Sequence, residues 1–233
     1  ATAGAPATGC AGIAAGRGCV GQPASQHAGN SSPNSRSLQP LVTPLSLSGM
    51  GIRNTTRRWG SVTQTLHWLI VALIVVQVTL AWIADDLPLG EKKLATLAYH
   101  KSVGITIFSL AIIRLVWRWL NPTPELPGTL KPYERLLARF THAALYVLLF
   151  AMPLSGWTMS SARGFPVSWF GFFQLPDLVP KSRPLYNALL DTHVTLACAL
   201  GVVVALHIAG ALKHHFMLRD DVLRRMLPFP GND

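Results

Sequence analysis

The 233-residue sequence has few charged residues and few cysteines, and each shortage excludes a class of protein. Charged residues make up 13% of the chain, against about 25% in a typical soluble domain, which argues against an ordinary water-soluble enzyme. The three cysteines form no C-x-x-C motif, which argues against a disulfide scaffold or a zinc ribbon. Hydrophobic residues make up 50% of the chain and exclude disorder for most of it. Together these features predict a membrane protein.

Acidic residues are also scarce. The chain has 10 aspartates and glutamates against 20 lysines and arginines, a net charge of +10 with the histidines neutral. In so apolar a chain, this excess indicates the cytoplasmic flanks of membrane spans rather than a nucleic-acid partner. Membrane lipid is therefore the expected surrounding partner.

Residues 1–49 contain no long hydrophobic run and are rich in Ala, Gly, Ser and Pro. They do not begin with a basic stretch followed by an apolar one, so they do not resemble a signal peptide. Their composition predicts disorder, and the spacing of Cys10 and Cys19 fits no metal site. Two interpretations stay open: a flexible tail, or an over-extended reading frame whose true initiator is Met50. The intact mass of the protein from its native host distinguishes them.

Residues 50–228 are expected to form one membrane domain, followed by a short tail at 229–233. A helix needs about 20 mostly apolar residues to cross the hydrocarbon layer. Four segments meet this requirement, at about 66–84, 97–119, 140–162 and 190–212. Lys101 and Arg114 interrupt the second segment, so their long side chains must extend toward opposite membrane surfaces. Pro153 predicts a kink in the third segment.

Four spans place both chain termini on the same side of the membrane. Twelve lysines and arginines flank the spans on that side and six on the other, so both termini are expected in the cytoplasm. The connection at 121–139 is then cytoplasmic and the longer one at 163–187 faces outward. Five aromatic residues in the outer connection predict a segment in the outer interface: Phe165, Trp169, Phe170, Phe172 and Phe173.

Five of the eight histidines lie inside or at the ends of the predicted spans: His67, His100, His142, His193 and His207. A lone histidine there is more often a hydrogen-bonded core residue. Ionisable residues within spans are nevertheless rare and mark functional sites by default. Since each neutral imidazole needs a partner in a dry environment, five of them across four spans indicate a binding site.

The depths of these histidines predict two pairs. His193 and His207 are 14 residues apart, about 21 Å and just under four turns of helix, so they share one face at two depths. His67 matches His207 at the cytoplasmic side, and His100 matches His193 at the outer side. Two histidines on facing helices at equal depth are what a bis-histidine haem requires, although neutral imidazole also suits zinc or copper. The absence of a C-x-x-C-H motif argues against covalent haem attachment.

His142 is left over at the cytoplasmic side. Three roles stay open for His142: partner of His207 in place of His67, contact of a haem propionate, or part of a quinone site. His67 is the preferred partner of His207. His214 and His215 are expected at the membrane surface, where they are surface residues or propionate contacts.

Four small residues lie near the predicted ligands: Gly104, Ala197, Gly201 and Gly210. Small side chains there would leave room for a haem. They would equally allow close helix packing, and both interpretations stay open.

In order along the chain, several short motifs resemble the four-span branch of the bacterial cytochrome b561 family. The resemblance covers about residues 57–228. Its motifs are Thr65-Leu66-His67-Trp68, His100-Lys101-Ser102-Val103-Gly104, Pro122-Thr123-Pro124, Pro153-Leu154-Ser155-Gly156, Leu206-His207, Lys213-His214-His215-Phe216 and Leu223-Arg224-Arg225-Met226-Leu227-Pro228.

This resemblance implies an all-α membrane protein, a four-transmembrane-helix bundle binding haem in the bacterial inner membrane with both termini cytoplasmic. It implies two non-covalent b haems, with iron ligands His67 and His207 on the cytoplasmic side and His100 and His193 on the periplasmic side. It also implies ubiquinone or menaquinone as electron partner. At least one member of the family oxidises superoxide and reduces quinone, and the family is compatible with a homodimer.

Superoxide chemistry would need an entrance that attracts anions near the outer haem. Lys101 and Arg163 lie closest to the predicted site and are assigned this role. Ordinary solvated loop charge accounts at least as well for Lys92, Lys93 and Lys181. Two alternatives stay open: a cytochrome b subunit that anchors a separate dehydrogenase or hydrogenase through the 121–139 or 163–187 connection, and a haem-free membrane scaffold or transporter.

Overall fold

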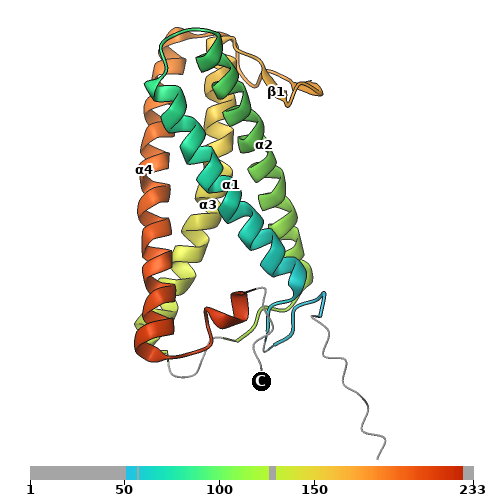
Figure 1. The fold of residues 1–233 in the computed structure, drawn as a ribbon, viewed down its shortest axis with the longest axis vertical. Helices are drawn as coiled ribbons and strands as arrows, with labels where there is room; N and C mark the ends of the chain where they lie inside the picture. Colours follow the sequence, from blue (N-terminus) through green and yellow to red (C-terminus); the bar gives the residue numbers. More distant parts are fainter. Residues whose placement is uncertain (1–50, 57, 126–129, 228–233) are drawn as a thin grey trace, which may run out of the picture. The chain divides into compact units, whose positions relative to one another are not determined.

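The computed structural model describes residues 51–56, 58–125 and 130–227. The interpretations of residues 1–49, of Met50 and of the tail at 229–233 lie outside these residues. Within the described part, four long helices run in sequence: α1 (Ser61–Asp86), α2 (Glu91–Leu120), α3 (Pro132–Arg163) and α4 (Arg183–Lys213) (Figure 1). Each of the four is long and apolar enough to cross a membrane. The prediction of a four-helix membrane protein is therefore confirmed.

Each helix extends beyond the apolar segment that predicted it, because local signals at the helix ends lie outside the hydrophobic run. α3 begins at Pro132, in a position where proline needs no backbone donor. Its first turn is capped by Glu134, whose Oε2 accepts the Lys131 backbone N–H at 3.1 Å. α4 begins after Ser182, whose Oγ accepts the Leu185 backbone N–H at 3.4 Å. α3 continues as one helix through Pro153.

The helices pack as neighbours in sequence: α1 on α2, α2 on α3, and α3 on α4. Much of the buried apolar core lies on α2, where Val103, Ile105, Ile107 and Ala111 are all buried. α4 contributes none of the buried residues, although it is 31 residues long and strongly apolar. In the described part of the chain, α1 and α4 do not form a closely packed pair. α4 therefore packs mainly on α3, and its histidines reach α1 and α2 only through their side chains.

A β-hairpin follows α3, formed by β1 (Val167–Trp169) and β2 (Phe173–Leu175) in antiparallel register. Phe170 and Gly171 both have positive φ and turn the chain between the strands. The hairpin packs on α2 through the Ser102 hydroxyl, which donates to Ser168 O at 2.9 Å. We call this end of the helices, where α3 ends and α4 begins, the hairpin end (Figure 1). The sequence predicts an aromatic surface segment here but not its strands, which are too short for an alternating pattern to indicate.

The opposite end carries the start of α1 and the end of α4, and we call it the basic end. A π-helix, η1 (His214–Leu218), and a 3₁₀ helix, η2 (Arg224–Met226), follow α4 there. η2 is held against α1 by the Trp68 Nε1–H, which donates to Met226 O at 2.9 Å. A salt bridge of 2.8 Å between Lys213 and Glu134 joins α4 to α3.

Candidate functional site

The four histidines that the sequence assigns as ligands form two pairs in the structure. His67 on α1 faces His207 on α4, with ring centres 6.3 Å apart and ring planes at 71°. His100 on α2 faces His193 on α4, with ring centres 6.4 Å apart and planes at 72°. All four side chains are partly buried. The structure thus brings together the two pairs that depth along the helices predicts, while their role as ligands stays a prediction.

The separation within each pair suits a metal between the rings. Two imidazoles that bind one metal ion from opposite sides have their centres roughly 6 Å apart, because each metal–nitrogen bond is about 2 Å long and each centre lies about 1 Å behind its nitrogen. In the described part of the chain, no three His, Cys, Asp or Glu side chains are grouped to hold a metal ion by themselves. Such a pair therefore suits a metal whose other ligands belong to a cofactor, as the iron of haem does.

The hydrogen bonds at the hairpin end fix which ring nitrogen carries the proton. His100 Nδ1 donates to the backbone carbonyl of Gln77 at 3.2 Å. His193 Nδ1 donates to Ser155 Oγ at 2.8 Å, since that hydroxyl itself donates to Met152 O at 2.8 Å. Nε2 is therefore the unprotonated nitrogen of both histidines and the atom that would bind a metal, and in His100 it accepts from the Gln77 amide. A partner on the other ring nitrogen is the usual means of orienting a metal-ligating histidine.

Gln77 is a polar residue in the middle of α1 that the sequence analysis missed. Its Nε2 lies 3.1 Å from His100 Nε2, and its Oε1 is buried with no hydrogen-bond partner among the described residues. Gly104 makes room for it, because a Cβ at that position would lie 3.3 Å from the Gln77 amide nitrogen. The sequence signal for Gln77 was its side-chain amide within a long uncharged segment, since a polar group in a membrane span needs a hydrogen-bond partner.

Glycines around the histidines leave space that side chains would fill. A Cβ at Gly156 would lie 3.1 Å from His193 Cε1, so this glycine is needed for the position of the imidazole. A Cβ at Gly201 or Gly210 would meet nothing within 4 Å among the described residues. Close helix packing therefore does not explain these two glycines. Gly104 does make a close contact, with Gln77, and Ala197 is exposed.

His142 lies close to the pair at the basic end. Its ring centre is 5.1 Å from that of His207, and its Nδ1 donates to Ala138 O at 2.6 Å. This separation is shorter than the distance of roughly 6 Å expected of two ligands on opposite sides of one metal. The His67–His207 separation of 6.3 Å fits better, which supports His67 as the partner.

Two further histidines of the basic end already have local contacts. His214 Nδ1 lies 2.6 Å from an Asp220 carboxylate oxygen. The ring of His215 packs on Phe216. Neither His214 nor His215 belongs to one of the two facing histidine pairs.

The two cations assigned to anion attraction both lie at the hairpin end. Lys101 follows His100 on α2, and its Nζ donates to Pro166 O at 2.7 Å and to Ser160 Oγ at 3.4 Å. Arg163 is exposed, with its guanidinium 4.7 Å from the centre of the Tyr186 ring. Neither is among the salt bridges of the described residues. Both charges are therefore free of a carboxylate in this part of the structure.

Comparison with known proteins identifies the family. Residues 58–229 match the family model described as prokaryotic cytochrome b561. The chain is 34% identical to cytochrome b561 homolog 2 of Escherichia coli (strain K12) over 196 residues, which are 79% of this chain and 98% of that protein. It is 30% identical to the probable superoxide oxidase CybB of Yersinia pestis over 171 residues, or 70% of this chain and 92% of the relative. It is 26% identical to cytochrome b561 homolog 1 of Escherichia coli (strain K12) over 164 residues, or 70% and 93%.

The family match covers nearly all of the described residues, with four membrane-capable helices and two facing histidine pairs. The resemblance drawn from the motifs is therefore confirmed. This chain is a membrane electron-transfer protein of the prokaryotic cytochrome b561 family.

Proposed function

We propose that this protein is an inner-membrane di-haem b cytochrome that transfers electrons from superoxide outside the cytoplasmic membrane to a membrane quinone. The arrangement of two histidine pairs, one toward each end of the bundle, carries the proposal. Membership of the family implies haem b. A relative named as a probable superoxide oxidase supports superoxide as the donor. Haem iron, when bound, supplies one-electron redox chemistry.

α4 would supply one ligand to each haem. His193 and His207 lie on the same face of this helix, about 21 Å apart along its axis. His100 on α2 and His67 on α1 would complete the two sites. Nδ1 of His100 and of His193 is held by a hydrogen bond, which limits the rotation of both rings. For Nε2 of His100 to bind iron, the Gln77 amide nitrogen, which lies 3.1 Å from it, would have to move aside.

The reaction requires a one-electron donor and a two-electron acceptor. Two superoxide anions each lose one electron and become dioxygen, and one quinone gains these two electrons and two protons to become a quinol. The free cations Lys101 and Arg163 would raise the local concentration of the anion at the hairpin end. Lys101 is held beside His100 by its bond to Pro166 O. This role places the hairpin end outside and the basic end in the cytoplasm, as the excess of positive charge predicts.

Replacing both Lys101 and Arg163 with glutamine is expected to lower superoxide turnover about tenfold at low ionic strength, because fixed charge raises encounter rates by 10-fold or more. The dependence of the rate on salt should become flatter. The measurement is the initial rate of superoxide consumption at salt concentrations from about 10 to about 300 mM, which lie on both sides of the physiological ionic strength. The control is Lys92→Gln, a cation in an exposed position near the same end. An unchanged rate and salt dependence in the double variant would show that these cations play no part.

Replacing Gly156 with valine is expected to remove the haem at the hairpin end. The new side chain would meet His193 Cε1, since even a Cβ would lie 3.1 Å from it, and the imidazole would have to move. We expect the haem content to fall from two per chain toward one. Gly90→Val is the matched control, because a Cβ there would meet only Pro88 O at 3.9 Å. Two haems per chain in the Gly156 variant would contradict the assigned position of His193.

A further inference from the structure

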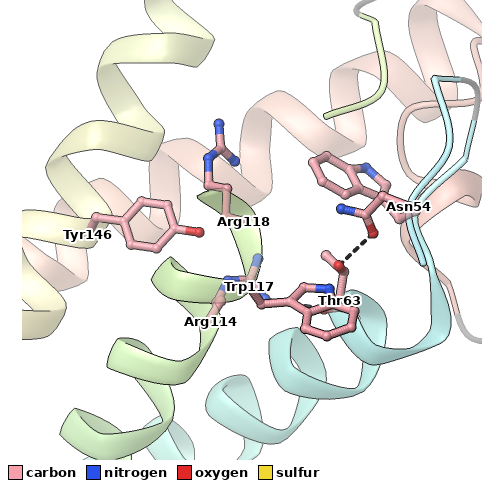
Figure 2. A pocket seen from close by; sticks show the side chains of 7 residues that line it. Asn54, Thr63, Arg114, Trp117, Arg118 and Tyr146 are labelled. Atoms are coloured by element: carbon pink, nitrogen blue, oxygen red, sulfur yellow. Dashed lines mark hydrogen bonds between the residues drawn. The ribbon is translucent and has the colours of Figure 1, made fainter. Parts of the chain in front are cut away.

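A small pocket at the basic end has a volume of about 10 Å³, room for roughly one water-sized atom. Its lining offers hydrogen-bond donors and positive charge (Figure 2). It lies where the segment before α1 meets α1, α2 and α3. Figure 2 shows Tyr146 of α3 on one side, Asn54 and Thr63 on the other, and residues of α2 between them. The residues used below are Asn54, Thr63, Arg114, Trp117, Arg118 and Tyr146.

Two buried donors in this pocket have no partner among the described residues. Asn54 is only 5% exposed. Its Oδ1 accepts the Gly60 backbone N–H at 2.9 Å and the Thr63 hydroxyl at 2.7 Å. Its amide nitrogen is buried without a hydrogen bond, and so is Trp117 Nε1. Leaving such groups unsatisfied costs about 1–3 kcal/mol each, so an acceptor is expected at this place.

The pocket also holds two positive charges. Arg114 and Arg118 are four residues apart on α2 and therefore lie on one face of the helix. Arg114 Nη1 donates to Thr63 O at 3.3 Å, and the Arg118 guanidinium lies 5.8 Å from the centre of the Tyr146 ring. Neither arginine belongs to a salt bridge of the described residues, and the pocket lining contains no carboxylate. Partly buried charges without a counter-charge are unfavourable.

We propose that this pocket binds one oxygen of a carboxylate or a phosphate, whose remaining atoms lie outside the pocket. An oxyanion accepts hydrogen bonds from guanidinium, amide and indole N–H groups and neutralises the arginines at the same time. A water molecule would satisfy the two unpaired donors but would leave both charges uncompensated.

Two membrane-associated groups have this chemistry. The first is the phosphate of an anionic lipid, because Arg118 lies in the last turn of α2, at the end of the helix, and basic pockets between membrane helices bind lipid headgroups. The second is a haem propionate, and this source rests on the proposed function. Thr63 lies four residues before His67 on the same face of α1, so the pocket is about one helical turn from the His67–His207 pair.

Asn54→Asp is the most informative test. It keeps the Oδ1 acceptor and replaces the unpaired amide nitrogen with a negatively charged carboxylate oxygen. This built-in anion would pair with the arginines and displace the bound group. Arg114→Gln instead removes one charge. The matched control is Arg139→Gln, an exposed arginine at the same end. Each purified protein would be placed in phosphatidylcholine vesicles with and without phosphatidylglycerol, followed by native mass spectrometry of retained lipid and redox titration of each haem.

A lipid phosphate source predicts that the wild-type protein and Arg139→Gln retain phosphatidylglycerol. Asn54→Asp and Arg114→Gln should then retain it at least tenfold less, with unchanged potentials. A propionate source predicts unchanged lipid retention and a shifted potential for one haem in both pocket variants. Wild-type lipid retention and wild-type potentials in both pocket variants would overturn the proposal. The lipid measurement needs no haem, so failure of the proposed function and failure of the anion site can be distinguished.

Discussion

Replacing His193 with alanine is expected to remove one of two b haems from the purified protein. It should also lower superoxide-dependent quinone reduction by at least about 100-fold, since even the loss of a residue that only supports a metal ligand costs 10–100-fold. His193 faces His100 at 6.4 Å between ring centres, and no other histidine is among its ring contacts in the described residues. Nothing there can therefore take its place. Haem content by pyridine haemochrome and quinone reduction by absorbance are the measurements.

The control for this experiment is His215→Ala. His215 packs on Phe216 at the basic end, in neither of the facing pairs, so both haems and full activity should be retained. His193 is only partly buried on a helix without buried residues. The alanine variant should therefore still insert and purify as a folded protein. Two haems per chain in the His193 variant would refute its assignment as a ligand.

Replacing His67 with alanine is expected to remove the other haem, whereas His142→Ala should leave two. The reason is geometric: the ring centres of His67 and His207 are 6.3 Å apart, but those of His142 and His207 are 5.1 Å apart. His142 is also held to its own helix through Ala138 O. Haem content of the two single variants is the measurement, with reduced-minus-oxidised spectra to show which haem is lost. The opposite result, one haem in His142→Ala and two in His67→Ala, would make His142 the ligand.

The helices and the histidine pairs could be predicted from the sequence because both depend on simple periodicities. Hydrophobic segments of about 20 residues predict spans independently of packing. The 14-residue spacing of His193 and His207 places both on one helix face, so their depths alone indicate the partners. The family motifs then led to the same four residues.

Other parts of the site depend on packing between segments far apart in the chain, which no local pattern shows. Gln77 meets His100 because α1 packs on α2, and Gly104 leaves the space for its amide. Ser155 was visible within a motif, but its hydrogen bond to His193 requires α3 beside α4. Asn54 accepts the backbone N–H of Gly60 just before α1, but it forms its pocket with Trp117 of α2. The β-hairpin was missed because its strands are only three residues long.

The number of haems per chain tests the central claim most directly. It is obtained from a pyridine haemochrome assay on detergent-purified protein, together with the protein concentration from amino-acid analysis and a reduced-minus-oxidised spectrum. Two non-covalent b haems per chain are the predicted result, one for each pair of facing histidines. One haem would mean that a pair is wrongly assigned, and no haem in correctly assembled protein would contradict electron transfer through these histidines.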